Sequence, residues 1–436
     1  AEAFVVCNDY RRGDFKPYIF RTKNYGQTWE RMVDENKVKG YALCMIQDPA
    51  EPNLIFAGTE HGLWVSFDNG TSFEQWKNGY PSVSTYDFAI QDREADLAIA
   101  TFGRSLWVLD DIRPLRKLAK AQTAKYFMSV PPTSINLSIK NSPYEWSTWG
   151  MWNAPNKPTG MPITIYSIDS VKKAKVQIKD AEDKVIRNLS FKLDSGFNRN
   201  YWGFEQKGKR AAGAPKAGGG GFGRRMAEEA SDAGAAEDKE FTGREVLAGQ
   251  YKVVVTVGAW KDSAMVQVAD DARLPNKREV VLAQDKLLDQ LQVVADKYNA
   301  AQDQLDDADL ILTQLKAEWK DKKDKGIDTL NKTHKVISDK VKGLREYMMG
   351  KKQEKQGYGT VPVITPIGVI RNASMLIMGK NTVPAEQEDA AIAAAVVAAD
   401  GVAAKVNAFF EKDWADFRKL VEATPIKKFK EVEVIK

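Results

Sequence analysis

The spacing of hydrophobic residues changes twice along the chain, and each change predicts a different kind of structure. Over residues 1–112, short apolar runs such as 3–7 and 54–59 are separated by turn residues, which predicts short strands. From 161 to 268 apolar and polar residues alternate over longer stretches, as in a small β-sandwich. Beyond 276 the apolar residues lie three and four apart, which predicts helices.

Residues 1–112 also contain a repeat. The segments AGTEHGLWVSFDNG, beginning at Ala57, and ATFGRSLWVLDDI, beginning at Ala100, align about 44 residues apart, a period typical of four-stranded β-propeller blades. The first unit lacks its innermost strand and the third lacks its outermost one. So few blades cannot close a ring. We therefore expect 1–112 to be the terminal blades of an incomplete propeller, completed by residues absent here or by another chain.

Two turns within these blades share the spacing S/T-x-D/N-x-G-x-S/T-W/F. The Asp or Asn side chain can accept backbone hydrogen bonds within its own turn, the glycine takes a positive φ, and the hydroxyl residue closes the loop. We expect the aromatic residue to be a buried anchor. The motif residues are Thr22, Asn24, Gly26, Thr28 and Trp29 in the first copy, and Ser66, Asp68, Gly70, Ser72 and Phe73 in the second.

The middle of the chain predicts a connector and then the sandwich. Residues 113–160 are rich in proline and contain Trp146, Trp149 and Trp152, a cluster more typical of a sealed domain junction than of a ligand site. Residues 161–271 form the predicted β-sandwich. Its segment 207–240 is rich in glycine, alanine and charge, which predicts a mobile insertion.

Residues 272–436 predict a helical hairpin or bundle. An apolar stripe from Leu287 to Leu315 is broken by Gly326 and resumes from Ile327 to Met348, as in two antiparallel helices. The apolar segment 357–380 is interpreted as irregular. Pro384 marks the expected start of a third long helix.

The order of these segments resembles a known family. The two turns are similar to the Asp box of BNR-repeat β-propellers (sialidase-like and sortilin-like proteins). The order VQIKDAEDKVIRNL, GFNRNYWGF, LAGQYKVVVTV resembles an immunoglobulin-like module. Together with FGRSLWVLDD, the chain resembles the C-terminal part of Bacteroidota proteins often labelled "glycosyl hydrolase". The resemblance implies a mainly β and then α multidomain protein, in which the Asp box is structural and not catalytic. It also implies an extracytoplasmic location: periplasm, outer-membrane surface or secreted.

The composition of the chain argues against several classes of binding site. The net charge of +5, from 64 basic and 59 acidic residues, is too balanced to indicate nucleic-acid binding. Two histidines exclude a His-rich metal site, and Cys7 and Cys44 lie in no metal-ligand spacing. Both cysteines are more typical of buried free thiols than of a disulfide. We therefore expect no metal and no cofactor. No apolar run approaches the ~18 residues of a transmembrane segment, so we expect none.

A binding rim is predicted from the blade topology. Loops between the second and third strands of each blade should share one face, opposite the Asp boxes, and such loops concentrate recognition. The alternative is that these are tight turns with solvated charges. The possible rim comprises Asp9, Tyr10, Arg11, Arg12, Glu60, His61 and Arg104.

No catalytic residue is identified. Asp110 and Asp111 could be a glycosidase pair, but adjacent strand residues point to opposite faces and cannot flank one bond. Solvated acids are the favoured interpretation. His334 lies on the helical stripe and is predicted to be a core residue.

The preferred hypothesis is a non-catalytic envelope or secreted interaction protein. Its propeller would bind a protein or peptide partner within a larger assembly, and a glycan is a possible partner. The alternative is a secreted, sialidase-like glycoside hydrolase whose catalytic residues lie mainly in the missing blades.

Overall fold

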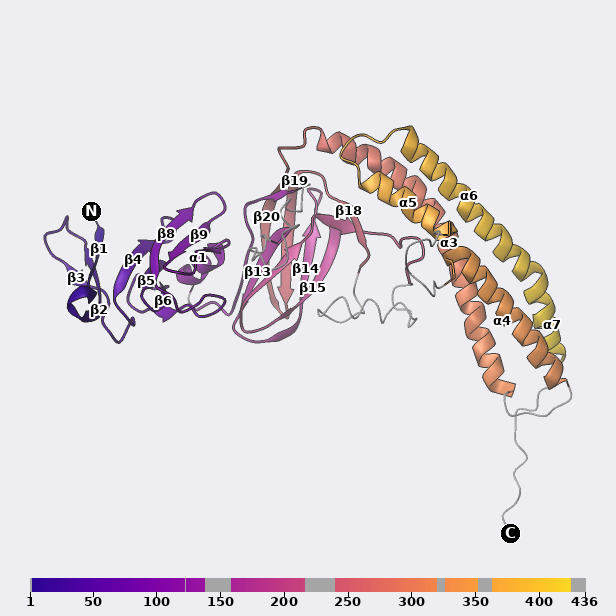
Figure 1. Cartoon of the computed structure of the whole chain (residues 1–436), viewed down its shortest axis with the longest axis horizontal. Coiled ribbons are helices and arrows are strands. Elements are labelled where there is room, and N and C mark those ends of the chain that lie inside the picture. Colours follow the sequence, from indigo (N-terminus) through magenta and orange to yellow (C-terminus); the bar gives the residue numbers. More distant parts are fainter. Residues whose placement is uncertain are drawn as a thin grey trace, which may run out of the picture. The chain divides into compact units, whose positions relative to one another are not determined.

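The computed structural model describes residues 2–121, 123–137, 158–215, 240–319, 326–351 and 363–424. The chain divides into two compact units, Ala1–Glu205 with Ala248–Asp271, and Gln206–Leu247 with Ala272–Lys436. The first unit is built mainly of β-sheets and the second mainly of helices (Figure 1). None of the described sheets closes into a barrel. The predicted mixture of β-structure followed by a C-terminal helical region is confirmed.

Three small antiparallel sheets begin the first unit, and in each the strands follow one another in chain order. Their bounds are β1 (Ala3–Asp9), β2 (Asp14–Thr22) and β3 (Glu30–Arg31) in sheet 1; β4 (Ala42–Gln47), β5 (Ile55–Thr59), β6 (Gly62–Ser66) and β7 (Glu74–Gln75) in sheet 2; and β8 (Thr85–Gln91), β9 (Asp96–Thr101) and β10 (Leu106–Leu109) in sheet 3.

Alternating apolar residues pack these sheets face to face. Ile19 of sheet 1 shares a buried cluster with Ile55 and Trp64 of sheet 2. On the other face of sheet 2, Phe56 packs with Phe88 and Ile99 of sheet 3. Sheet 2 is therefore covered on both faces, and its strands β5 and β6 are buried along their whole length. This double burial explains their near-continuous apolar sequence.

A short helix, α1 (Arg113–Lys120), closes the end of sheets 2 and 3. Its Leu115 and Ala119 join the cluster between them. Arg116 also forms an ion pair with the buried Asp48, with 2.8 Å between Nη2 and Oδ2. Asp48 Oδ1 accepts hydrogen bonds from the backbone N–H groups of Ala50 and Glu51. One carboxylate therefore holds both the β4–β5 turn and the helix.

The sandwich consists of two sheets. Sheet order is β11-β13-β16 in one and β12-β20-β19-β14-β15 in the other. Trp202 is fully buried, and its ring lies 5.5 Å from that of Tyr251 in the second sheet. The strands are β11 (Tyr126–Ser129), β12 (Thr133–Asn136), β13 (Met161–Ser167), β14 (Val171–Lys179), β15 (Val185–Leu193), β16 (Gly196–Trp202), β19 (Gly249–Val257) and β20 (Trp260–Asp270).

The region predicted to be a connector contributes two of these strands. β11 pairs antiparallel with β13, and β12 pairs parallel with β20 in the other sheet. Pro131 and Pro132 stand between them, where the chain passes from one sheet to the other. Both strands are only four residues long, which is too short for their alternation to be recognised. Trp146, Trp149 and Trp152 lie outside the described residues.

The stem of the predicted insertion is hydrogen-bonded in the second unit. β17 (Glu205–Lys207) pairs with β18 (Thr242–Glu245). Arg210 donates to both carboxylate oxygens of Asp303, at 2.9 Å each. Asn299 accepts from the backbone N–H of Gly213. Residues 216–239, which hold most of the glycine-rich stretch, lie outside the described residues.

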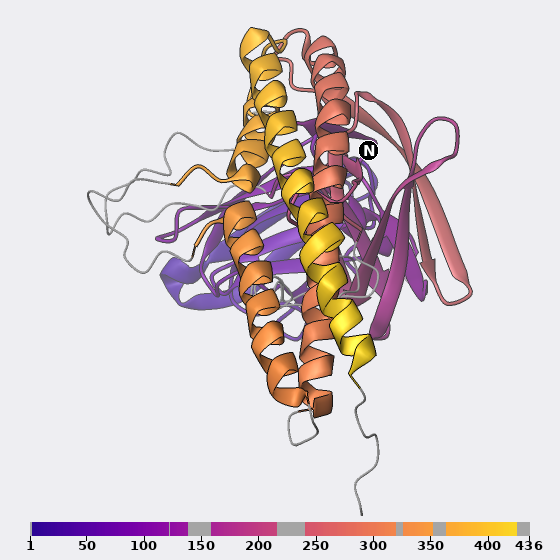
Figure 2. The same cartoon turned by 90° about the vertical axis from the view of Figure 1, so that its right-hand side faces the viewer.

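Three columns of helix form the second unit around one apolar cluster (Figures 1 and 2). The first is α3 (Lys277–Trp319), and the second consists of α4 (Ile327–Met349) followed by α5 (Pro366–Met378). The third is α6 (Glu386–Ala408), the π-helical segment η3 (Phe409–Trp414) and α7 (Ala415–Ala423). The predicted helical stripe is confirmed: Leu291, Tyr298, Leu305 and Leu312 are all buried.

The interpretation of 357–380 as irregular is wrong for α5. Thr365 caps this helix by accepting a hydrogen bond from Gly368 N, and Pro366 occupies its first turn. These are ordinary helix-start signals, and they begin a helix inside the segment that is predicted to be irregular. Pro384 lies two residues before α6 rather than inside it.

One helical stretch, Glu386–Ala423, is long and apolar enough to cross a membrane by length and composition alone. Its buried residues Ile392, Ala395, Ala399 and Val402 form one stripe that packs into the helical core. Such a stripe is typical of a helix that packs in a bundle.

Candidate functional site

The second of the two motif turns, which we call Asp-box turns for their resemblance to that motif, is built on the carboxylate of Asp68. Its Oδ1 accepts from Ser66 Oγ at 2.8 Å and from the backbone N–H of Ser72 at 2.9 Å, and its Oδ2 accepts from Ser72 Oγ at 2.6 Å. Ser66 Oγ in turn accepts from Gly70 N at 2.9 Å. Burial raises the pKa of Asp68, but the hydrogen bonds from Ser72 and Ser66 outweigh it and hold the pKa below its ordinary value.

The first turn has the same hydrogen-bond network, except that the bond between the Asn side chain and the hydroxyl group of residue 28 has the opposite donor. Asn24 Oδ1 accepts from Thr22 Oγ1 at 3.0 Å and from Thr28 N at 2.9 Å, and Thr22 Oγ1 accepts from Gly26 N at 2.9 Å. Asn24 Nδ2, however, donates to Thr28 Oγ1 at 2.9 Å, whereas the Asp68 carboxylate accepts from Ser72. The predicted local chemistry of both boxes is therefore confirmed.

Each turn contains two consecutive residues with positive φ. Gly26 and Gly70 have φ of 84° and 83°, as predicted, and Tyr25 and Asn69 before them have φ of 58° and 56°. The sequence pattern does not specify the first of these positions. Asn accepts this conformation more readily than Tyr does, so the second turn has the better-adapted residue.

The two aromatic anchors differ. Phe73 is buried in the cluster between sheets 1 and 2, as predicted, but Trp29 is 45% exposed. Phe73 is covered because sheet 1 packs on that side of sheet 2. In the part of the chain that the structure describes, no sheet packs against sheet 1 in the corresponding place. The prediction of a buried Trp29 is wrong because an Asp-box aromatic depends on the preceding sheet for its burial.

The glycines of the two boxes give a matched test of this difference. We expect Gly70→Ala to destabilise the first unit by about 2–4 kcal/mol, because a Cβ there combines left-handed strain with overlap against the buried Met32. Gly26→Ala has only the strain, about 1–2 kcal/mol, since its nearest neighbour is Trp29 at 3.9 Å. Differential scanning calorimetry of both variants measures this. Equal losses would contradict the packing role of the second box.

The candidate binding rim lies at the strand ends opposite the Asp boxes. In sheet 2, the turn 60–61 joins β5 to β6, and the box joins β6 to β7. The two turns are at opposite ends of β6 because the strands are antiparallel. By the same topology, the rim turns of sheets 1 and 3 lie at 10–13 and 102–105.

Aromatic rings gather at the sheet 1 end of this rim. Tyr10 stacks on Tyr41, with 4.7 Å between ring centroids and 16° between the planes. Phe15 lies 6.2 Å from Tyr41 and is 56% exposed. The Arg11 guanidinium is 5.9 Å from the centre of the Tyr10 ring. Asp9 and Arg12 form an exposed ion pair with 3.8 Å between Oδ2 and Nη1.

The turn at Glu60 and His61 is fixed from several sides. Glu60 N donates to Tyr41 O, and His61 N donates to Thr59 Oγ1 at 3.1 Å. The carbonyl of His61 accepts from Gln75 Nε2 and from Ser82 Oγ, both at 2.9 Å. Glu60 and His61 are thus held in place by backbone contacts, while half of the His61 side chain remains exposed.

Sheet 3 adds two exposed rings. Tyr86 and Phe102 lie 5.9 Å apart and are 46% and 73% exposed. Burial and then the charge of Glu60 raise the pKa of the Tyr41 hydroxyl. Arg104 lies in the same turn as Phe102, and its carbonyl accepts from Trp107 Nε1. We call this set the aromatic rim: Tyr10, Phe15, Tyr41, Tyr86 and Phe102.

The charged half of this surface and the Tyr10 ring are predicted from the sequence, whereas the other four rings are not. Tyr41, Tyr86 and Phe102 stand at the ends of three different strands, far apart in sequence. A signal was present, since each residue borders a predicted strand at its rim end. Rigidly held rings with exposed faces, flanked by both signs of charge, can bind an extended peptide or a sugar by stacking.

Of the two acids after β10, Asp111 does not lie in solvent as predicted. Asp111 is only 4% exposed, and its Oδ1 pairs with Arg113 Nη1 at 2.8 Å. The carbonyls of Asp110 and Asp111 accept from the two Nη groups of Arg199 in the sandwich. Asp111 is therefore a buried structural acid rather than a solvated one.

The remaining candidates are structural. Cys7 is exposed, contrary to the prediction of a buried thiol, because β1 is an open edge strand. Burial raises the pKa of Cys44 to about 12, and its Sγ donates to Thr85 O. His334 is buried, as predicted, with Nε2 2.9 Å from Leu312 O. Among the described residues, no group of His, Cys, Asp or Glu side chains could hold a metal ion.

Comparison with known proteins adds little. No protein-family model matches the chain, and no curated protein matches it. Among solved structures, the chain is similar to dimeric latent PorU from Porphyromonas gingivalis, at 12% sequence identity and a TM-score of 0.18. The match covers 53% of this chain and 16% of the PorU chain. A TM-score this low carries no argument about fold or function.

Proposed function

We propose that this protein is a non-catalytic interaction protein that binds an extended segment of a protein partner along the aromatic rim. The observation that supports the proposal most directly is the rim itself. Rings from all three of the first sheets lie at the same end of their strands, in one group around Tyr41 and one pair at Tyr86 and Phe102, and three of them are more than one-third exposed. Exposed, rigidly supported aromatic residues are the usual anchors of peptide recognition.

The three sheets are best explained as consecutive blades of an Asp-box β-propeller. They follow one another in sequence, pack face to face, and carry the Asp box at the same place in two of them. The outer faces of the set remain apolar: Val5 of sheet 1 is 40% exposed, and Leu106 and Val108 of sheet 3 are 71% and 60% exposed. Further blades, from the same or another polypeptide, would cover these faces. On this proposal, the second part of the first unit is an immunoglobulin-like sandwich.

The partner is expected to carry proline or aromatic residues, because stacking on Tyr and Phe rings favours flat or rigid groups. Arg11, Glu60 and His61 would supply polar contacts at the border of the rings. In line with the family that the sequence resembles, we place the protein in the bacterial envelope or outside the cell, as a subunit of a larger assembly. The glycoside-hydrolase alternative remains a prediction from sequence alone.

The proposal is tested by removing the two most accessible neighbouring rings. We expect Tyr86→Ser with Phe102→Ser to reduce the partner proteins recovered from a bacterial envelope extract by about tenfold or more, since two anchors of about 1 kcal/mol each are lost. Recovery is quantified by mass spectrometry against the wild type.

The control is Tyr25→Asn. It removes an 83% exposed ring outside the rim and reproduces the residue found at the same position of the second Asp box. Undiminished capture by the double rim variant, at unchanged thermal stability, would show that the rim is not the binding surface.

A further inference from the structure

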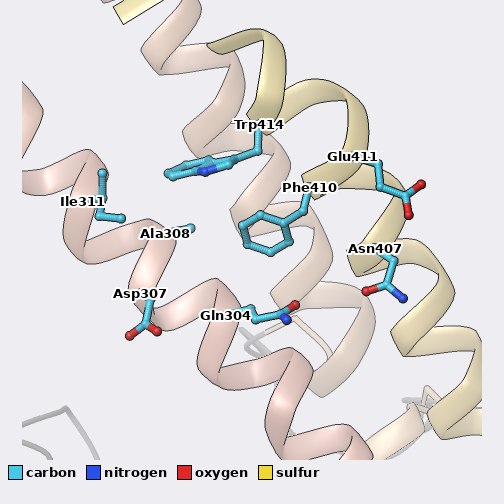
Figure 3. A pocket seen from close by; sticks show the side chains of 8 residues that line it. All are labelled: Gln304, Asp307, Ala308, Ile311, Asn407, Phe410, Glu411 and Trp414. Atoms are coloured by element: carbon cyan, nitrogen blue, oxygen red, sulfur yellow. The ribbon is translucent and has the colours of Figure 1, made fainter. Parts of the chain in front are cut away.

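A second surface with ligand-binding character lies in the helical unit, between α3 and η3 (Figure 3). It is an open pocket of about 370 Å³. Phe410 and Trp414 project from η3 toward α3, where Ala308 and Ile311 form the opposite wall (Figure 3). The volume is within the usual range for ligand pockets. None of the functions considered above uses it.

The pocket owes its aromatic wall to a change in helix type. Six residues, Phe409–Trp414, have π-helical hydrogen bonding between the α-helices on either side. Such segments are rare and occur often at functional sites. Here Phe409 is buried in the core, whereas Phe410 and Trp414 remain partly exposed, with 5.8 Å between their ring centroids and 64° between the planes.

The border of the pocket is acidic. Asp307 on α3 and Glu411 on η3 both line it and are exposed. The structure assigns no ion pair or side-chain hydrogen bond to either carboxylate among the described residues. The nearby acids differ: Asp306 and Asp309 both lie within ion-pair distance of Arg345, and Asp413 pairs with Lys340.

Neither of these two acids has a basic residue at the usual helical spacing on its own helix. The residues three and four positions from Asp307 are Asp303, Gln304, Leu310 and Ile311. For Glu411 they are Asn407, Ala408, Trp414 and Ala415. None is basic, so neither acid has the usual i,i+3 or i,i+4 partner on its own helix. Lys412 follows Glu411 in sequence but does not line the pocket.

We propose that this pocket binds an arginine side chain of a partner polypeptide. The guanidinium would stack on the rings of Phe410 and Trp414 and pair with the carboxylate of Asp307 or of Glu411, which lie on opposite sides of the two rings (Figure 3). The amides of Gln304 and Asn407, which also line the pocket, supply oxygen acceptors beside them.

Arginine fits these features better than lysine or an apolar residue. Its planar guanidinium stacks on aromatic faces and offers five donors, whereas a lysine ammonium is compact and strongly hydrated. An apolar side chain would pack against the two rings but would leave both carboxylates without a partner. The site lies in the helical unit and does not depend on the aromatic rim.

The test uses the full chain labelled with ¹⁵N in its tryptophan indoles and titrated with acetyl-Gly-Arg-Gly-amide. The Trp414 indole N–H signal is assigned through Trp414→Phe. We expect this signal to shift in a saturable manner with the arginine peptide. The citrulline peptide has nearly the same shape without the charge, and we expect it to bind about fivefold more weakly or worse.

Matched variants locate the interaction. Asp307→Asn with Glu411→Gln should weaken arginine-peptide binding about fivefold, whereas Asp416→Asn removes an exposed charge two residues from Trp414 and should leave it unchanged. Equal binding of arginine and citrulline peptides, equal binding of a lysine peptide, or no effect of the double variant would each overturn the proposal. A shift that follows protein concentration without peptide would identify a second copy of the chain as the occupant, and would also overturn it.

Discussion

Gly58→Ala is expected to cause one of the two largest losses of stability in the first unit, about 3 kcal/mol or more. Gly58 lies in β5, directly against Thr85 of β8 in sheet 3. A Cβ there would lie 2.6 Å from the carbonyl oxygen of Thr85 and 2.9 Å from its Cγ2, and would overlap Cys44 Sγ. The backbone carbonyl cannot rotate away as a side chain could. The sheets must therefore separate, and the cluster around Phe56 and Phe88 loses its packing.

Calorimetry measures this loss, and hydrogen exchange of peptides from β5 and β8 localises it. Gly343→Ala is the control, because nothing lies within 4 Å of a Cβ at that helical position. We expect Gly343→Ala to stabilise α4 by about 0.5–1 kcal/mol. A fully stable Gly58→Ala variant would mean that sheets 2 and 3 do not pack as described.

Asp48→Ala is expected to have a similar effect, about 3–5 kcal/mol, for an electrostatic reason. The side chain of Asp48 is completely buried. Its removal would leave the Arg116 guanidinium, which is 18% exposed, without its partner, and would free two backbone N–H groups of the β4–β5 turn. Because the pair joins the turn to α1, the helix should detach from sheets 2 and 3.

The comparison variant is Asp48→Asn, which can keep the bonds to Ala50 N and Glu51 N while losing the charge. We expect it to fall between the wild type and Asp48→Ala. The readout is hydrogen exchange of the peptide that contains α1, together with the melting temperature. If exchange in α1 were unchanged in Asp48→Ala, the ion pair would not be what holds the helix.

The sequence predicted local chemistry well and long-range burial poorly. Both Asp-box turns form with the expected donors and acceptors, because every bond is made within eight residues. The burial of Trp29 and Asp111 could not be predicted because it depends on packing: no further sheet covers Trp29 in the part of the chain that the structure describes, and Arg113 and the distant Arg199 surround Asp111. The strands β11 and β12 were missed because four-residue elements carry too little periodicity, whereas α5 was missed although Thr365 and Pro366 are helix-start signals.

In the candidate sites, too, the features set by local sequence could be predicted and those set by packing could not. The charged part of the rim follows from turn positions that a repeat reveals, so Arg11, Glu60 and His61 could be named in advance. Tyr41 and Phe102 join them only through strand topology. The helical pocket could not be predicted, because it depends on a single π-helical segment that rotates Trp414 toward α3.

The placement of β11 and β12 has a mechanical consequence. The segment between the first three sheets and the sandwich is paired into both layers of the sandwich, antiparallel on one side and parallel on the other. Lys117 of α1 also donates to the carbonyl of Met128 in β11. A segment paired in this way cannot extend under force as an unstructured linker would. Force applied through the first three sheets must shear several strand-pairing hydrogen bonds at once, so this unit should transmit tension before it lengthens.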